Sequence, residues 1–185
     1  MRQHLYMNLR EWDEHYQSAT PDLSPSPLLV EAVKAIAPGR ALDLACGLGR
    51  NALYLAQLGW EVTAVDGSGQ AIARLNKEAT RRGLTLKARA ADLEAGEFAI
   101  ETEKWDLIVC CLYFQRDLLA GIKRGLKTGG LYVASALLAD ESKAGSPFRV
   151  QPGELPSSLS GWQILQSAEK REAKHATPEL VARKQ

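Results

Sequence analysis

One short stretch of this sequence constrains the fold most strongly, because the mostly apolar residues 41–44 run directly into a glycine-rich turn and then into a helical pattern. A second apolar run, 61–65, ends in Asp66. An apolar strand, a glycine turn, a helix and a carboxylate at the end of the next strand form the nucleotide-binding half of an open α/β sheet. Ligands of such sheets bind at the carboxyl ends of the strands, where the helix N-terminus faces them. The pattern therefore predicts a nucleotide site and leaves the nucleotide open.

Strand and helix patterns alternate along most of the chain, which predicts a doubly wound, mostly parallel α/β sheet. The expected strands are 41–44, 61–65, 84–90, 106–112 and 131–138, and the expected helices are 27–36, 50–58, 70–82 and 114–126. Two short strands near the end, 162–167 and 179–182, have no helix between them and should pair antiparallel.

The chain is expected to form a single domain with four parts. These are a helical cap over 1–38, a cofactor-binding core over 39–138, an irregular substrate-side excursion over 139–160 and a C-terminal β-hairpin over 161–185. The excursion is rich in proline, glycine and serine, and too little chain follows it to build another core.

Composition and charge exclude several classes of function. The net charge of +1 gives no electrostatic reason to expect nucleic acid or an anionic membrane as a partner. The apolar runs are far shorter than a membrane span, so we expect a soluble, cytoplasmic protein. Its three cysteines make no disulfide framework, and His4, His15 and His175 are too far apart in sequence to predict a metal site. The sequence leaves the oligomeric state open.

Asp43, directly before the glycine turn, separates two interpretations of that turn. Gly47 to Ala52 formally satisfies the dinucleotide pattern G-x-G-x-x-G/A, so an NAD-dependent oxidoreductase is one alternative. The carboxylate of Asp43 would repel a pyrophosphate in a partly desolvated site, but it suits a ligand that carries an ammonium and a sulfonium. S-adenosylmethionine is such a ligand. If Asp43 only caps the turn, it does not discriminate between the two.

The residues from Asp43 to Asn51 closely resemble motif I of class I S-adenosylmethionine-dependent methyltransferases, with Ala45 in place of the first glycine. The chain also resembles the tellurite-resistance (TehB-like) branch of this class, in which Cys-Gly-x-Gly-Arg-Asn is followed by a helix of the Ala-Leu-Tyr-Leu-Ala kind, here residues 46–56. Three further stretches fit the same branch: 12–16, 153–155 with 161–162, and 180–184. The resemblance implies a seven-stranded sheet with helices on both faces and an antiparallel C-terminal strand. It also implies S-adenosyl-L-methionine as cofactor and S-adenosyl-L-homocysteine as its product.

The resemblance implies a role for each part of the cofactor site. Asp43 and the backbone from Ala45 to Gly49 should hold the methionine end, Asp66 should accept from both ribose hydroxyls, and Asp92 with Leu93 should contact the adenine. Asp92 fits equally well as a turn-capping residue, and the adjacent Cys110 and Cys111 fit better as packing residues than as a metal site. The predicted cofactor contacts are Asp43, Ala45, Cys46, Gly47, Gly49, Arg50, Asn51, Asp66, Gly67, Asp92, Leu93 and Cys110.

The acceptor is constrained mainly by the chemistry of methyl transfer, which is an in-line displacement that needs alignment and exclusion of water. A soft acceptor such as a thiol or a selenium or tellurium oxyanion needs no strong general base. The predicted function is methylation of a small molecule, on a soft nucleophilic atom. The residues expected on the acceptor side of the site are Tyr16, Tyr113, Arg149, His175 and Arg183. The alternatives are the NAD-dependent oxidoreductase, a cofactor-binding protein without turnover, and a methyltransferase that acts on protein or nucleic acid.

Overall fold

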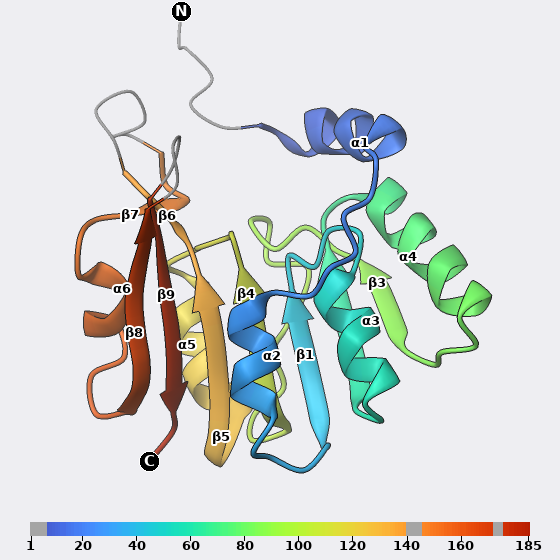
Figure 1. Cartoon of the computed structure of the whole chain (residues 1–185). Helices are drawn as coiled ribbons and strands as arrows, with labels where there is room; N and C mark the ends of the chain where they lie inside the picture. The colour runs from blue at the N-terminus through green and yellow to red at the C-terminus, as the bar shows by residue number, and fades with distance from the viewer. Residues whose placement is uncertain (1–6, 140–145, 172–175) are drawn as a thin grey trace, which may run out of the picture.

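The computed structural model describes residues 7–139, 146–171 and 176–185, which form a seven-stranded sheet in the order β3-β2-β1-β4-β5-β9-β8 (Figure 1). Five strands are parallel, whereas β9 runs antiparallel to both β5 and β8. The strands are β1 (Arg40–Leu44), β2 (Glu61–Asp66), β3 (Lys87–Ala90), β4 (Trp105–Cys111), β5 (Leu126–Ser135), β8 (Gln163–Arg171) and β9 (Ala176–Arg183). The predicted fold class, including the antiparallel C-terminal strands, is confirmed.

The strand order reverses between β1 and β4. From β1 the chain adds β2 and β3 on one side of the sheet and then returns to place β4 and β5 on the other side. Leu44 of β1 pairs with Cys110 of β4, so the carboxyl ends of these two strands lie next to each other. A reversal of this kind opens a crevice at the carboxyl edge, which is where ligands of α/β sheets bind.

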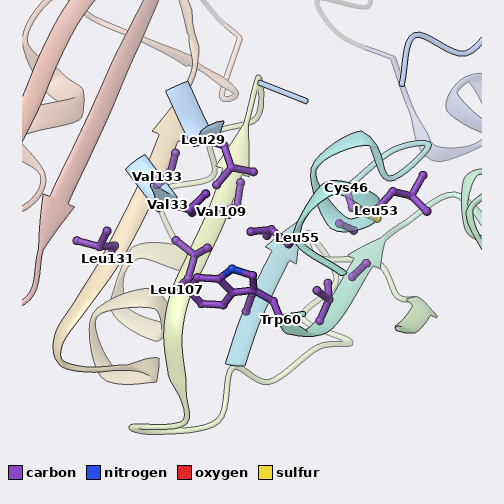
Figure 2. Close-up of a cluster of buried hydrophobic side chains, with 14 of the residues drawn as sticks. Leu29, Val33, Cys46, Leu53, Leu55, Trp60, Leu107, Val109, Leu131 and Val133 are labelled. Atoms are coloured by element: carbon purple, nitrogen blue, oxygen red, sulfur yellow. The ribbon is translucent and has the colours of Figure 1, made fainter. Parts of the chain in front are cut away.

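Helices cover both faces of the sheet (Figure 1). One buried cluster joins α2 (Pro27–Val33), α3 (Arg50–Gln57) and α4 (Gly69–Arg81) to one face, and a second joins α5 (Leu118–Gly125) and α6 (Glu154–Ser157) to the other. Successive strand residues alternate between the clusters, so Ala41 packs in the first and Leu42 in the second. Figure 2 shows the first cluster, where Leu29 of α2 and Leu55 of α3 lie near Val109 of β4.

Helix α1 (Leu9–Ser18) is held over the carboxyl end of the sheet by polar contacts and buries none of its own residues. Its Asp13 carboxylate accepts from the Ser68 hydroxyl at 2.5 Å and from the backbone N–H of Gln70 at 3.2 Å. The guanidinium of Arg74 on α4 donates to the carbonyl oxygen of Tyr16 at 2.5 Å and to that of Ala19 at 2.9 Å. The helical cap predicted at the N-terminus thus contains a helix fastened to α4.

Several element boundaries differ from the sequence-based prediction. The predicted strand 131–138 is β5 over 126–135 followed by β6 (Leu137–Leu138), because Leu126 already pairs with Trp105 before a shift in register. The helix predicted over 114–126 begins only at Leu118, and β3 begins at Lys87. The predicted excursion contains α6 and β7 (Arg149–Val150), which pairs parallel with β6. Within the described residues, no helix is long and apolar enough to cross a membrane.

Candidate functional site

A cavity of about 640 Å³ lies at the carboxyl edge of the sheet. The turns that follow β1, β2, β3 and β4 form its floor, and Leu9, Trp12 and Tyr16 of α1 line its opposite side. The cavity therefore occupies the crevice at the strand reversal, where the sequence predicts a nucleotide site.

Two glycines allow α1 to approach the floor of the cavity closely. A Cβ on Gly47 would lie 2.9 Å from the hydroxyl oxygen of Tyr16, and a Cβ on Gly67 would lie 2.8 Å from Cδ1 of Leu9. Gly47 also has a φ of +54°, which disfavours residues that carry a side chain. Because Gly47 and Gly67 carry no side chain, the floor of the cavity is bare backbone at these two positions and α1 can pack directly against it.

Ala45 and Gly49 have different roles from Gly47. Ala45 lines the cavity and has a φ of 51°, a left-handed conformation that costs an alanine energy and explains why related motifs carry glycine here. Gly49 lies outside the cavity lining, and a Cβ on it would lie 2.2 Å from Cδ1 of Leu75. Gly49 therefore permits close packing of α3 against α4.

Asp66 ends β2 and lines the cavity with only 8% of its surface exposed. Its Oδ2 accepts from the backbone N–H of Gly47 at 2.7 Å and its Oδ1 from that of Ser68 at 2.9 Å. Burial raises the pKa of this carboxyl, although these two N–H groups counteract the effect. A carboxylate has about four lone-pair sites, so each oxygen of Asp66 retains acceptor capacity toward the cavity.

Asp43 lies one layer deeper and does not line the cavity. Its side chain is on the face of β1 covered by α3 and is 1% exposed, and its Oδ2 is a buried oxygen without a hydrogen-bond partner in the described structure. Burial raises the pKa of this carboxyl to about 7; the backbone N–H of Ala52 counteracts the rise and the nearby Asp66 adds to it. The placement fits an electrostatic effect on the cavity rather than direct contact.

Asp92, Leu93 and Glu94 line the cavity after β3. The Oδ1 of Asp92 accepts from the backbone N–H groups of Glu94 at 2.8 Å and Ala95 at 3.1 Å, so Asp92 does cap a turn. Burial and the neighbouring Asp92 raise the pKa of Glu94. Asp92 therefore both caps a turn and lines the cavity. Its contact with adenine stays a prediction.

The two adjacent cysteines point to opposite faces of the sheet, as expected for strand neighbours. Cys111 lines the cavity, and burial raises the pKa of its thiol to about 11. Cys110 is buried in the cluster beneath α5, where its Sγ contacts the carbonyl oxygen of Tyr113 at 3.3 Å. Among the described residues, no three histidine, cysteine or acidic side chains form a metal site.

The cavity brings together most of the predicted cofactor residues. Those that line it are Ala45, Cys46, Gly47, Arg50, Asp66, Gly67, Asp92 and Leu93, whereas Asp43, Gly49, Asn51 and Cys110 lie outside the lining. Asn51 instead accepts from the backbone N–H of Ser26 at 2.9 Å and so positions the start of α2. Leu48, within the predicted backbone from Ala45 to Gly49, also lines the cavity, as does Cys111, for which the sequence favours packing. Sequence reasoning missed Asn8, Leu9, Trp12, Asp22, Glu94 and Leu112.

The substrate-side candidates are distributed unevenly. Tyr16 and Tyr113 line the cavity, and burial raises the pKa of both hydroxyls. Arg149 does not line it and donates to the carbonyl oxygen of Leu138 at 2.7 Å. Arg183 pairs with Leu131 near the opposite end of the sheet. His175 lies outside the described residues.

Comparison with known proteins agrees with this geometry. The chain matches the family described as "Tellurite resistance protein TehB" over residues 10–184. It belongs to the TehB family. A crystal structure of TehB from Haemophilus influenzae superposes with a TM-score of 0.76 at 25% identity, covering 96% of this chain and 67% of that one. The chain thus has the class I methyltransferase fold.

Curated relatives extend the match at the level of sequence. A protein of Haemophilus influenzae named "Probable S-adenosyl-L-methionine-dependent methyltransferase TehB" is 31% identical over 161 residues, which are 82% of this chain and 55% of that protein. "Hemagglutinin 1" of Eikenella corrodens is 32% identical over 157 residues, covering 80% and 51%. This TehB-family chain therefore spans about half the length of the curated relatives it matches.

Proposed function

We propose that this chain binds S-adenosyl-L-methionine and transfers its methyl group to a soft nucleophilic atom of a small molecule. The observation that carries the proposal is Asp66, a buried carboxylate at the end of β2 that lines the cavity and keeps acceptor capacity on both oxygens. Two such acceptors suit the adjacent hydroxyls of a ribose. Membership of the TehB family supports the choice of methyl donor over NAD.

The rest of the floor fits the other parts of this cofactor. Asp92 and the backbone of Leu93 would contact the adenine, and the bare backbone at Gly47 would lie along the methionine end. Arg50, the first residue of α3, would attract the methionine carboxylate, helped by the positive end of the helix dipole. A cation bound in front of the turn would favour ionisation of the buried Asp43 carboxyl, and the resulting carboxylate would in turn stabilise the cationic end. When bound, the cofactor supplies an activated methyl group on a sulfonium.

The side chains around the cavity favour a soft acceptor. Among the described lining residues there is no histidine or lysine, and the thiol of Cys111 and the hydroxyls of Tyr16 and Tyr113 have raised pKa values. Such groups stay protonated near neutral pH and are poor general bases, so the bases that remain in the described lining are carboxylates, Glu94 among them. A thiol is partly ionised near neutral pH and a selenium or tellurium oxyanion needs no proton removed, whereas a phenol or a protonated alkylamine must first lose a proton.

The proposal is tested with S-adenosylmethionine labelled in its methyl group and acceptors of matched size. Labelled product is expected with a thiol, selenite or tellurite, and at least tenfold less with phenol or an alkylamine. Saturating NAD should leave the rate unchanged. Preference for phenol would overturn the soft-acceptor part, and failure to transfer methyl to any soft acceptor would overturn the proposed reaction. Labelling of protein or RNA in place of small molecules would favour the macromolecular alternative.

A further inference from the structure

The N-terminal segment crosses the cavity in a defined direction. Leu9, the first residue of α1, lies against Gly67 in the turn that follows β2. Tyr16, near the end of the helix, lies against Gly47 in the turn that follows β1. The chain then leaves α1 and reaches Asp22, which also lines the cavity. The segment therefore runs from the proposed ribose position toward the proposed methionine position, and Asp22 comes last.

Hydrogen bonds hold the chain on both sides of Asp22. Before it, the guanidinium of Arg74 donates to the carbonyl oxygen of Ala19 at 2.9 Å. After it, the backbone N–H of Ser26 donates to Oδ1 of Asn51, the second residue of α3, at 2.9 Å. Figure 1 shows this stretch passing the start of α3 on its way to α2. Asp22 is therefore restrained close to the N-terminus of α3.

The Asp22 carboxylate is oriented by its own turn. Its Oδ1 accepts from the backbone N–H of Ser24 at 2.9 Å, which is the pattern of an Asx turn. The hydrogen bonds from Ser24 lower the pKa of this exposed carboxyl, so it is ionised at neutral pH. Because a carboxylate has about four lone-pair sites, Asp22 keeps acceptor capacity for a ligand in the cavity.

Arg50 supplies the opposite charge on the same side of the cavity. It is the first residue of α3 and lines the cavity, and its charge adds to the lowering of the pKa of Asp22. A charge has this effect on a carboxyl only when the two groups lie near each other. The part of the cavity next to the start of α3 therefore presents a cation and an anion together.

This pair of charges matches the amino-acid end of the proposed cofactor. The methionine part of S-adenosylmethionine carries an α-carboxylate and an α-ammonium on one carbon. The guanidinium of Arg50 suits the carboxylate, and the Asp22 carboxylate suits the ammonium, which has three N–H donors and no acceptor. Asp43 does not line the cavity, so it can act on the same ammonium only through the electrostatic field.

From these observations we propose that Asp22 binds the α-ammonium of the methyl donor and makes the cavity selective for ligands with a complete amino-acid group. The inference rests on the proposed function and assigns a cofactor contact to the chain between α1 and α2. Asp22 acts in binding alone, because the ammonium keeps its proton and stays remote from the methyl group. A nucleoside that lacks the amino-acid group would leave Asp22 without this partner.

One variant and three ligands test the inference by isothermal titration of the full chain. S-adenosylhomocysteine carries the whole amino-acid group, its deamino analogue 4-(adenosylthio)butanoate lacks only the ammonium, and 5′-methylthioadenosine lacks the entire group. Asp22→Asn removes the charge, while the asparagine Oδ1 can still accept from the N–H of Ser24. Analogues that bind weakly are measured by displacement of S-adenosylhomocysteine.

The variant should respond to the ammonium alone. Because Asp22 is exposed, we expect the Kd for S-adenosylhomocysteine to rise about tenfold, the lower end for a hydrogen bond to a charged group. The Kd for the deamino analogue and for 5′-methylthioadenosine should rise less than about threefold. Equal weakening of all three ligands would overturn the inference, because Asp22 would then only shape the cavity.

Asp117→Asn is the matched control. Asp117 is also an exposed aspartate in front of a helix, α5, but it does not line this cavity. Its substitution should leave all three Kd values unchanged, and circular dichroism checks that both variants fold. If Asp117→Asn weakened S-adenosylhomocysteine as much as Asp22→Asn does, the effect would be one of net charge and the inference would be wrong.

The same titrations separate the inference from the proposed function. If S-adenosylhomocysteine does not bind to the wild-type chain, the proposed function fails and the inference falls with it. If it binds to the wild type and to Asp22→Asn with equal Kd, only the inference is overturned.

Discussion

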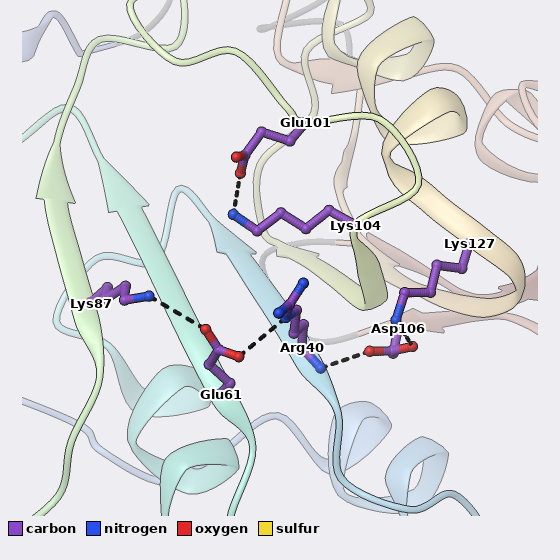
Figure 3. A network of polar contacts seen from close by, with 7 residues as sticks. All are labelled: Arg40, Glu61, Lys87, Glu101, Lys104, Asp106 and Lys127. Atoms are coloured by element: carbon purple, nitrogen blue, oxygen red, sulfur yellow. Dashed lines mark hydrogen bonds and ion pairs between the residues drawn. The ribbon is translucent and has the colours of Figure 1, made fainter.

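At the amino end of β2, Glu61 accepts from Arg40 at 3.2 Å and from Lys87 at 3.3 Å, so one carboxylate joins three neighbouring strands (Figure 3). At the carboxyl end of the same strand, Asp66 faces a cavity and accepts only backbone N–H groups among its described contacts. The pKa of Glu61 is lowered by Arg40 and Lys87, whereas burial raises that of Asp66.

The same contrast holds between β4 and β1. Burial alone would raise the pKa of Asp106, but the backbone N–H of Arg40 and the ammonium of Lys127 lower it (Figure 3). Among the described residues no cation is bonded to Asp43, and burial raises its pKa more than the nearby Arg50 lowers it. Carboxylates at the amino end are thus neutralised by the protein itself. Those at the carboxyl end are desolvated and oriented, which is the arrangement that a cationic, hydroxyl-rich ligand would complete.

The largest effect is expected at the two ends of β2. Asp66→Asn removes the charged acceptor that we propose binds the ribose, and because hydrogen bonds to charged groups contribute about 1.5–3 kcal/mol each, binding of S-adenosylhomocysteine should weaken about 100-fold. Glu61→Gln is the matched control and should leave the Kd unchanged. Isothermal titration measures both, with circular dichroism to check folding. Equal Kd values for the two variants would contradict the claim that the carboxyl end of β2, and not its amino end, binds the ligand.

The second prediction concerns the pH dependence of stability. Folded Asp43 keeps its proton up to about pH 7, whereas the unfolded chain releases it near 3.8, so the folded state binds more protons in between. The free energy of unfolding should therefore fall as the pH rises from about 4 to 7, and Asp43→Asn should remove on the order of 4 kcal/mol of this decline.

Asp106→Asn should change the pH dependence of the unfolding free energy in the opposite direction from Asp43→Asn. The pKa of Asp106 is lowered in the folded state, so its stabilising contribution is present above pH 3.8 and is lost as the pH falls through its folded pKa. Urea titrations across this range measure each variant. If the unfolding free energy of Asp43→Asn declined with rising pH as steeply as that of the wild type, Asp43 would not be the group that binds the proton in the folded state.

The third prediction applies one substitution at the two ends of β1. Ala45→Gly relieves a left-handed alanine and should stabilise the fold by about 0.5–1 kcal/mol. Ala41→Gly, at a fully buried strand position, should destabilise it by about 1–2 kcal/mol through lost apolar burial and added chain entropy. Melting temperatures that shift in the same direction would contradict the proposed strain at Ala45.

The smallest effect is expected in the surface network of Figure 3. Lys87 is 76% exposed and its contact with Glu61 is 3.3 Å long, so solvent screens the pair. Lys87→Ala should change the free energy of unfolding by less than about 0.5 kcal/mol and leave ligand binding intact. A larger loss, measured by thermal unfolding at low and high salt, would show that the amino end depends on its charges more than solvent screening allows.

The floor of the cavity could be predicted from the sequence because it is local. An apolar run followed by Gly47 and Gly49 fixes a strand, a turn and a helix within a few residues, and Asp66 ends the next strand. The side formed by α1 could not be predicted in the same way. Its position depends on contacts such as Arg74 to Tyr16, which join residues far apart in sequence.

Leu112 and Leu126 show two further limits. Leucine normally avoids a positive φ, so nothing local marks Leu112 as a turn residue; the bonds to Ser135 of the neighbouring strand impose it. The sequence after Leu126, with Gly129 and Gly130, looks like a turn, yet β5 begins there because Leu126 pairs with Trp105. Pairing between strands overrides local preference in both cases.

The most direct test of the account is isothermal titration of the wild-type chain with S-adenosylhomocysteine in the presence and absence of saturating NAD. The account predicts binding of one ligand per chain with a Kd on the order of micromolar, about −8 kcal/mol, and no effect of NAD. Absence of binding heat, or displacement by NAD, would contradict the claim that the carboxyl end of the sheet is a methyl-donor site.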